Sequence, residues 1–380
     1  FAKEQPDLNW ECKELRQKIY EMINWWLEKG IAGFRIDAIT FIKKDLSFAS
    51  RPTNDGELYP VEKLTDYKGI GTFLDEMKEQ CFDKYNCMTV AEAPGGDDAA
   101  FERYAGKNGY FSMIFDFGWE NMEGENDKSS IHAVERWKKK MFTHVAHNSG
   151  IGWSAIFLEN HDQSRCLNKF LERENISFYS ASALASIYFF LYGTPFIYQG
   201  QEIGMTNVKW KNINDMDDIR AKRTYEEAVG QGKDPDEVLA YFSELGRDNA
   251  RTPMQWDDSE NGGFTCGKPW IKCNDNYRTI NAQSEVNDPD SLYNYYKRLI
   301  QCYHDHADIV RQAEFRPMYE EYPGLFAYER EVNGKGLLVI VNFTNEKLMF
   351  QKIDQKCVLC NYHETESEWL QPYEARIYSK

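Results

Sequence analysis

Short apolar runs alternate with longer amphipathic segments through most of the chain. The runs are apolar on both faces, which is typical of parallel strands buried inside a sheet; they cover residues 33–37, 88–92, 111–117, 153–162 and 194–200. The segments between them carry apolar residues at helical spacing, which predicts helices over residues 12–29, 67–85, 131–148 and 177–191. Strands and helices that alternate in this way predict a parallel sheet with right-handed crossovers.

The alternation provides five strand–helix units. A closed (β/α)8 barrel has eight such units, whereas an open doubly wound sheet would need no more. Because the glycine fingerprint of dinucleotide-binding sheets is absent, the pattern favours an α/β fold that forms the latter five units of a TIM barrel. We therefore expect an upstream amino-terminal segment of about 150–200 residues to complete the barrel, since an open barrel leaves strand edges unpaired.

Two further regions follow the alternating part. Residues 204–262 are polar and rich in helix-forming segments, and an insertion of this length at a barrel rim is usually functional. A helix over 291–306 precedes alternating apolar and polar residues at 325–330, 337–343 and 375–378, which predict a small antiparallel β domain. We expect residues 1–306 to form the C-terminal part of a catalytic barrel, with the rim insertion at 204–262, and residues 307–380 to form a C-terminal β-sandwich.

Composition and charge exclude some classes of function. The formal charge of -16 disfavours a nucleic-acid partner, which needs clustered lysine and arginine, and it favours a neutral substrate. No apolar run has the length of a membrane span, so we expect no membrane partner. The nine cysteines are irregularly spaced, which fits reduced thiols in a cytoplasmic protein. Cys357 and Cys360 form one CxxC pair without a second pair, so we interpret them as structural.

Three of the predicted strands end in a carboxylate: Asp37, Glu92 and Asp162. The carboxyl ends of barrel strands face the side where such barrels place their chemistry. Carboxylates gathered there suggest glycoside hydrolysis, in which one attacks and another donates a proton. Arg35 stands two residues before Asp37, so both side chains point the same way on a strand, and the cation favours the ionised carboxylate. His161 precedes Asp162, but no HxH or HExxH spacing supplies companion ligands for a metal.

Five ordered motifs resemble those of a known enzyme family. Residues 33–38 (GFRIDA), 91–95 (AEAPG) and 159–165 (ENHDQSR) resemble three signature regions of the α-amylase family of glycoside hydrolases. Residues 200–208 (GQEIGMTNV) and 247–256 (RDNARTPMQW) look like the oligo-1,6-glucosidase and α-glucosidase branch. The resemblance covers nearly the whole chain, although the family's earliest signature, an Asp…Asn-His segment, has no match in it.

The resemblance implies a role for each carboxylate. Asp37 matches the nucleophile, Glu92 matches the acid that protonates the leaving oxygen, and Asp162 matches the third carboxylate, which holds ring hydroxyls of the distorted sugar. The mechanism would then retain the anomeric configuration, with the carboxyl groups of Asp37 and Glu92 about 5–5.5 Å apart. The matching substrate-side residues are Arg35, His161 and Arg251.

The expected function is that of a retaining, exo-acting α-glucosidase on short oligosaccharides. In the branch that the chain resembles, valine directly after the nucleophile is associated with α-1,6 bonds, and smaller or polar residues are associated with α-1,4 bonds. Ala38 at this position therefore leads us to expect some α-1,4 activity. Alternatives within the branch are a trehalose-6-phosphate hydrolase and a sucrose isomerase. From another class, a non-catalytic homologue that serves as a transporter accessory subunit remains open. The resemblance implies no cofactor in this segment, with a possible structural calcium in the expected upstream part.

Overall fold

The computed structural model describes residues 5–47, 49–52, 58–60, 68–93, 98–115, 117–119, 122, 128–365 and 368–380. The chain forms two compact units. The first unit consists of Phe1–Phe117 with Gly150–Ala155, and the second consists of Gly118–Ser149 with Ile156–Lys380. Predicted strand and helix residues at Tyr67 and Asp116, and the motif positions Pro94 and Gly95, lie outside the described residues.

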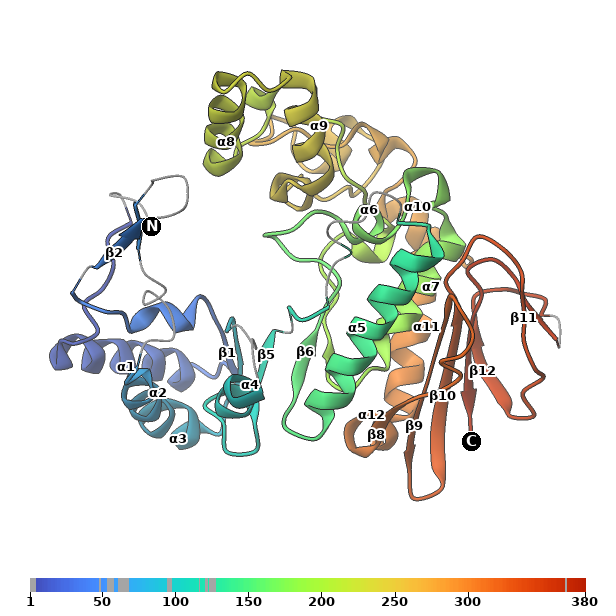
Figure 1. The fold of residues 1–380 in the computed structure, drawn as a ribbon, viewed down its shortest axis with the longest axis horizontal. Coiled ribbons are helices and arrows are strands. Elements are labelled where there is room, and N and C mark those ends of the chain that lie inside the picture. The colour runs from blue at the N-terminus through green and yellow to red at the C-terminus, as the bar shows by residue number, and fades with distance from the viewer. Residues whose placement is uncertain are drawn as a thin grey trace. The chain divides into compact units, whose positions relative to one another are not determined.

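The first unit contains parallel strands in the order β1, β4, β5 and β6. Of β6, only Ser154 and Ala155 belong to this unit. Helices separate these strands along the chain (Figure 1), and the apolar faces of α1, α2 and α4 share one core. The elements are α1 (Lys13–Glu28), β1 (Gly33–Ile36), α2 (Ile70–Met77), α3 (Asp83–Tyr85), β4 (Met88–Ala91), α4 (Asp98–Ala105), β5 (Met113–Phe115) and β6 (Ser154–Ile156).

The predicted helices and parallel strands of this unit are confirmed, with two differences. The segment over residues 43–66, which we expected to be a loop, contains a short antiparallel pair of strands, β2 (Ser50–Pro52) and β3 (Leu58–Pro60). The helix predicted to end at Tyr85 is a continuous helical segment whose middle, Lys78–Phe82, has π-helical hydrogen bonding. Helix α4 was not predicted.

In the second unit, the carbonyl of Ile156, the last residue of β6, accepts a hydrogen bond of 2.7 Å from the backbone N–H of Phe196. Strand β7 is only two residues long, so the predicted strand over 194–200 is largely irregular chain. The elements are α5 (Ile131–Ser149), α6 (Cys166–Phe170), α7 (Phe178–Phe189), β7 (Thr194–Pro195), α8 (Ile219–Gly230), α9 (Pro235–Leu245), α10 (Ala282–Asn287), α11 (Leu292–Asp305) and α12 (Ala307–Gln312).

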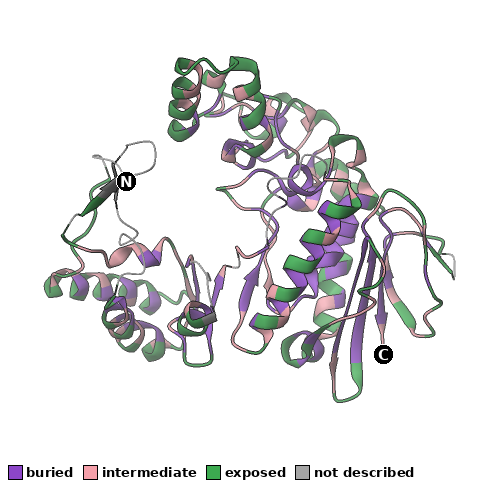
Figure 2. Ribbon diagram, viewed as in Figure 1, coloured by how far each residue is buried: buried purple, intermediate pink, exposed green. Residues whose placement is uncertain are grey.

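An antiparallel sheet completes the second unit, as the alternating pattern predicted. Its five strands lie in the order β12, β14, β10, β9 and β8, and β11 and β13 form a separate pair. Both faces of β9 and β10 are buried (Figure 2): one packs with α5, α7 and α11, and the other packs on Phe350 and Leu370. The strands are β8 (Glu314–Pro317), β9 (Leu325–Val332), β10 (Lys335–Asn342), β11 (Leu348–Met349), β12 (Lys356–Cys360), β13 (Trp369–Leu370) and β14 (Ala375–Ser379). The domain boundary at residue 306 stays a prediction.

The first residue of β1 has no room for a side chain beside β4. Gly33 pairs with Met88, and a β-carbon built on Gly33 would overlap the backbone carbonyl of Met88. Glycine at this position therefore lets the two strands approach closely enough for a regular parallel ladder. In that ladder the last residues of the two strands, Ile36 and Ala91, lie opposite each other.

A buried ion pair fixes the loop that follows β6. Arg165 Nη1 lies 2.9 Å from Glu159 Oε1, and both side chains are 1% exposed or less. The other carboxylate oxygen of Glu159 accepts the backbone N–H of Cys166, the first residue of α6. Arg165 also donates to the carbonyl of Gln199, at 2.7 Å. The ends of the segment 159–166 are thus joined to each other and to the chain that follows β7.

Arg165→Met should destabilise the protein by about 3–5 kcal/mol, because it leaves the Glu159 carboxylate buried without its cation. Urea unfolding followed by circular dichroism measures the loss. Arg173→Met is the matched control, since Arg173 pairs with Glu244 at the surface, where both side chains are more than a third exposed and such pairs contribute about 0–1 kcal/mol. Equal effects of the two substitutions would contradict this account.

Gly33→Ala should destabilise the first unit by about 1–3 kcal/mol, because the new methyl group forces β1 away from β4. Amide hydrogen exchange across β1 and β4 should become faster in the variant. Gly230→Ala serves as the control, because no atom lies within 4 Å of the position of its β-carbon. Unchanged exchange in both variants would show that the strands tolerate the extra volume.

Candidate active site

The first unit brings Asp37 and Glu92 to the same edge of the parallel strands. Ile36 and Ala91, the last residues of β1 and β4, are register partners. The backbone N–H of Glu92 donates to the carbonyl of Ile36 at 2.9 Å, which holds the two strand ends level. Each carboxylate therefore follows its strand directly, as the sequence pattern predicted.

One guanidinium joins the two carboxylates. Arg35 Nη2 lies 2.6 Å from Glu92 Oε2, and Arg35 Nη1 pairs with Asp37 Oδ1. The guanidinium carbon also lies 5.9 Å from the centre of the Phe115 ring on β5. Asp37 is the most exposed of the three charged groups, so its carboxylate is accessible to a molecule at the strand ends. The structure therefore brings Arg35, Asp37 and Glu92 together.

Ala38 adopts a left-handed backbone conformation, with φ 44° and ψ 37°. This conformation is uncommon for residues other than glycine and is unfavourable for β-branched side chains. It turns the chain sharply after Asp37 into a 3-10 helix over Ile39–Ile42, in which Ile39 is buried. The turn separates the exposed Asp37 from the buried residues that follow.

In the second unit, the strand that was predicted to reach Asp162 ends earlier, at Ile156. Beyond the strand, Glu159 is buried and pairs with Arg165. His161 and Asp162 then lie in a turn, where the Asn160 side-chain oxygen accepts the backbone N–H of Asp162 at 2.8 Å. The carboxylate of Asp162 is thus presented by a pinned loop rather than by the strand itself.

Asp162 is surrounded by three potential cations. Arg251 Nη2 lies 2.5 Å from Asp162 Oδ1, and Arg247 Nη1 lies 3.2 Å from the same oxygen. His161 Nε2 lies 3.3 Å from the other oxygen, Oδ2. Arg251 Nε also donates to the backbone carbonyl of His161 at 2.6 Å. The structure therefore brings together His161, Asp162 and Arg251, which were predicted, and adds Arg247, which was not.

Arg247 is held in turn by Asp218 through two hydrogen bonds of 2.6 and 2.8 Å. Burial by itself would raise the pKa of Asp218, but the hydrogen bonds and the charge of Arg247 outweigh it and hold that pKa below its usual value. The hydrogen bonds to Asp218 raise the pKa of Arg247. A signal for Arg247 was available, because it is the first residue of the same motif that contains Arg251.

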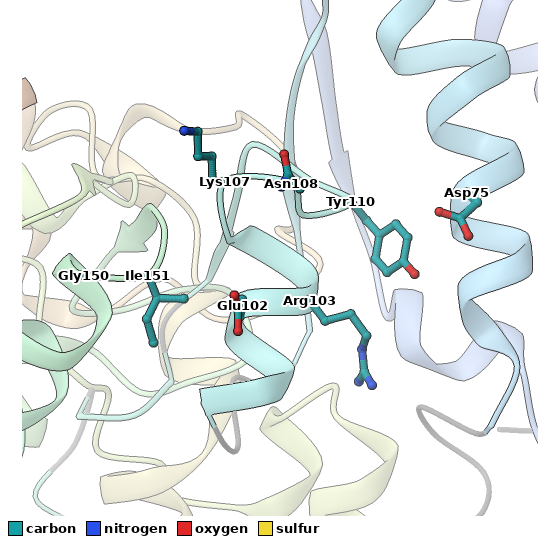
Figure 3. Close-up of a pocket in the computed structure, with 8 residues that line it drawn as sticks. All are labelled: Asp75, Glu102, Arg103, Lys107, Asn108, Tyr110, Gly150 and Ile151. Atoms are coloured by element: carbon teal, nitrogen blue, oxygen red, sulfur yellow. The ribbon is translucent and has the colours of Figure 1, made fainter.

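A pocket of about 530 Å³ in the first unit lies away from these carboxylates (Figure 3). Tyr110 precedes β5, and Gly150 and Ile151 precede β6, so the pocket is at the amino ends of the strands. The charged side chains of Arg103 and Lys107 point in different directions in this view. They do not converge on one ligand, so we do not assign the pocket to the candidate active site.

In the part of the chain that the structure describes, no three side chains of His, Cys, Asp or Glu are arranged to hold a metal ion. Within the same residues, no helix combines the length and the apolar character needed to cross a bilayer. The absence of a cofactor and the possible calcium stay predictions.

Comparison with known proteins places these residues in context. Residues 1–313 match the family model described as "Alpha amylase, catalytic domain". An oligo-1,6-glucosidase of Halalkalibacterium halodurans is 39% identical over 402 residues, which cover 100% of this chain and 70% of that protein.

Solved structures give the same result. A variant of the trehalose-6-phosphate hydrolase of Bacillus licheniformis matches with a TM-score of 0.88 and 34% identity, over 100% of this chain and 70% of that one. The isomaltulose synthase of a Klebsiella species matches with a TM-score of 0.88 and 31% identity, over the same shares. These neighbours confirm the TIM-barrel fold class, and the chain belongs to the alpha-amylase family of glycoside hydrolases.

Proposed function

We propose that the chain is a retaining, exo-acting α-glucosidase that hydrolyses α-1,6 and/or α-1,4 bonds at the non-reducing end of short oligosaccharides. The observation that carries the proposal is the pairing of Asp37 and Glu92 with the single guanidinium of Arg35. Two carboxyl groups held close together are what a retaining glycosidase requires. The oligo-1,6-glucosidase relative, at 39% identity, supports the substrate class.

The proposed mechanism has two steps. Asp37 attacks the anomeric carbon and forms a glycosyl ester, while Glu92 transfers its proton to the departing glycosidic oxygen. Glu92, now a carboxylate, then takes a proton from water, whose oxygen attacks the same carbon and displaces Asp37. Two inversions at one carbon leave the product with the configuration of the substrate. The exposed carboxylate of Asp37 and its bond to Arg35 suit the role of nucleophile.

We propose that Asp162 holds hydroxyl groups of the sugar, as its match to the third carboxylate of the family implies. Asp162 keeps one carboxylate oxygen away from the two arginines, since both bind Oδ1, and an oxygen in that position can accept hydrogen bonds from sugar hydroxyls. The His161 ring, whose Nε2 lies 3.3 Å from Oδ2, and the guanidinium of Arg251 lie beside it. Donors and an acceptor gathered around one carboxylate suit a polyhydroxyl ligand.

The alternatives have weaker support. The trehalose-6-phosphate hydrolase and isomaltulose synthase neighbours are 34% and 31% identical, below the 39% of the oligo-1,6-glucosidase. A non-catalytic accessory protein would have no need for the three carboxylates and their arginine partners. We propose a cytoplasmic location, which the nine free cysteines support.

Asp37→Asn should lower the rate of isomaltose hydrolysis by at least about a thousandfold, because an amide cannot attack the anomeric carbon. Proton NMR of the first product of the unaltered enzyme should show α-glucose before mutarotation. Asp83→Asn, an exposed position at the start of α3, controls for loss of a surface charge. Undiminished hydrolysis by Asp37→Asn, or β-glucose as the first product, would refute the mechanism.

Ala38→Val should shift the ratio of kcat/KM values from maltose towards isomaltose by about tenfold, since one or two methyl groups in a pocket discriminate by about 10–200-fold. Valine is also strained in the left-handed conformation of this position. Ala38→Thr is the matched control: it is β-branched and equally strained, but it is polar. If valine and threonine change the ratio equally, backbone strain and not the apolar side chain sets the linkage preference.

A further inference from the structure

We propose that Asp218 is a positioning residue of this enzyme, which acts through Arg247 on the carboxylate of Asp162. The inference rests on the glucosidase function proposed above. Asp218 lies in the polar insertion over residues 204–262, at the N-cap of α8, in a part of the chain that none of the family motifs covers.

The geometry of the Arg247 guanidinium carries the proposal. Its Nε and Nη2 atoms, which form one edge of the planar group, donate to the two oxygens of Asp218 at 2.8 and 2.6 Å. The remaining nitrogen, Nη1, projects from the other edge and lies 3.2 Å from Asp162 Oδ1. A guanidinium held on two nitrogens cannot rotate in its plane. The direction of Nη1 is therefore determined by Asp218.

Asp218 is itself held firmly. Its side chain is only 7% exposed, and its Oδ1 also accepts the backbone N–H of Arg220 at 3.1 Å, which caps α8. Its own backbone N–H donates to the buried carboxylate of Asp248 at 2.9 Å. Asp248 directly follows Arg247 in the chain. Asp218 therefore binds two neighbouring residues, Arg247 through its side chain and Asp248 through its backbone N–H.

Charge balance gives Asp218 a second effect on Asp162. Asp162 and Asp218 together carry two negative charges, and Arg247 and Arg251 carry two positive charges. Without the charge of Asp218, both arginines would compete for the single carboxylate of Asp162. That competition would engage the oxygen that otherwise accepts sugar hydroxyls. Asp218 thus both directs Arg247 and limits its hold on Asp162.

A double-mutant cycle tests the proposal with isomaltose as the substrate. Asp218→Asn keeps an N-cap acceptor for α8, because asparagine caps helices as well as aspartate does, but it removes the charge and one acceptor. We expect kcat/KM to fall by about ten- to a hundredfold, mostly in kcat, because Asp162 is proposed to act on the distorted sugar. In an Arg247→Gln background, Asp218→Asn should change kcat/KM by less than about twofold.

Two variants complete the design. Asp234→Asn changes the N-cap of α9 in the same insertion, where the side chain accepts the N–H of Asp236, and it should leave kcat/KM unchanged. Asp218→Ser keeps a capping oxygen without a charge and should lose as much activity as Asp218→Asn.

The outcomes separate the two proposals. An enzyme that cleaves no α-glucoside refutes the proposed function and this inference with it. An active enzyme in which Asp218→Asn has no effect, or the same effect with and without Arg247, overturns the inference alone. If both Asp218 variants unfold at the assay temperature, Asp218 is a structural cap and the positioning role is wrong.

Discussion

Carboxylates gathered beyond the ends of strands repel one another, and the structure depends on arginines that offset this repulsion within each unit. The chain carries a formal charge of -16, so no general excess of cations can provide the compensation. Arg35 serves two carboxylates in the first unit. In the second unit Arg165 pairs with Glu159, and Arg247 links Asp218 to Asp162. Two carboxylates of the same unit can lie close together because a guanidinium binds both of them, as Arg35 binds Asp37 and Glu92.

The loop after β6 shows how burial separates a structural pair from a functional one. Glu159 and Arg165 are buried and bound to each other, whereas Asp162 lies between them in sequence and has a half-exposed carboxylate. Neither partner of a buried ion pair can be removed without a large loss of stability, since the other would be left as an uncompensated buried charge. The closed pair therefore holds both ends of the loop in place. Asp162 can then be partly exposed on a loop whose two ends are anchored.

Local patterns in the sequence predicted the elements and the first unit's site well. Apolar runs and helical spacing located β1, β4, α1, α5, α7 and α11, because burial on one or both faces leaves a periodic trace. The carboxylates at residues 37 and 92 followed because they stand directly after their strands. The early end of β6 and the β2–β3 pair were not predicted. Both features depend on contacts between residues that are apart in the sequence. The local spacing of apolar residues gives no information on such contacts.

The second unit's site was only partly predicted, for a related reason. Arg251 came from a family motif, but Arg247 in the same motif and Asp218 in the insertion were missed. Their relationship spans 29 residues and appears only when α8 and the segment after α9 are folded together.

The insertion has a core of its own, in which Trp210, Met216 and Phe242 pack, and its first helix is capped by the residue that holds Arg247. The position of Arg247 beside Asp162 therefore depends on the correct folding of this polar segment. Asp218 can in this way affect a carboxylate that it does not touch, through Arg247.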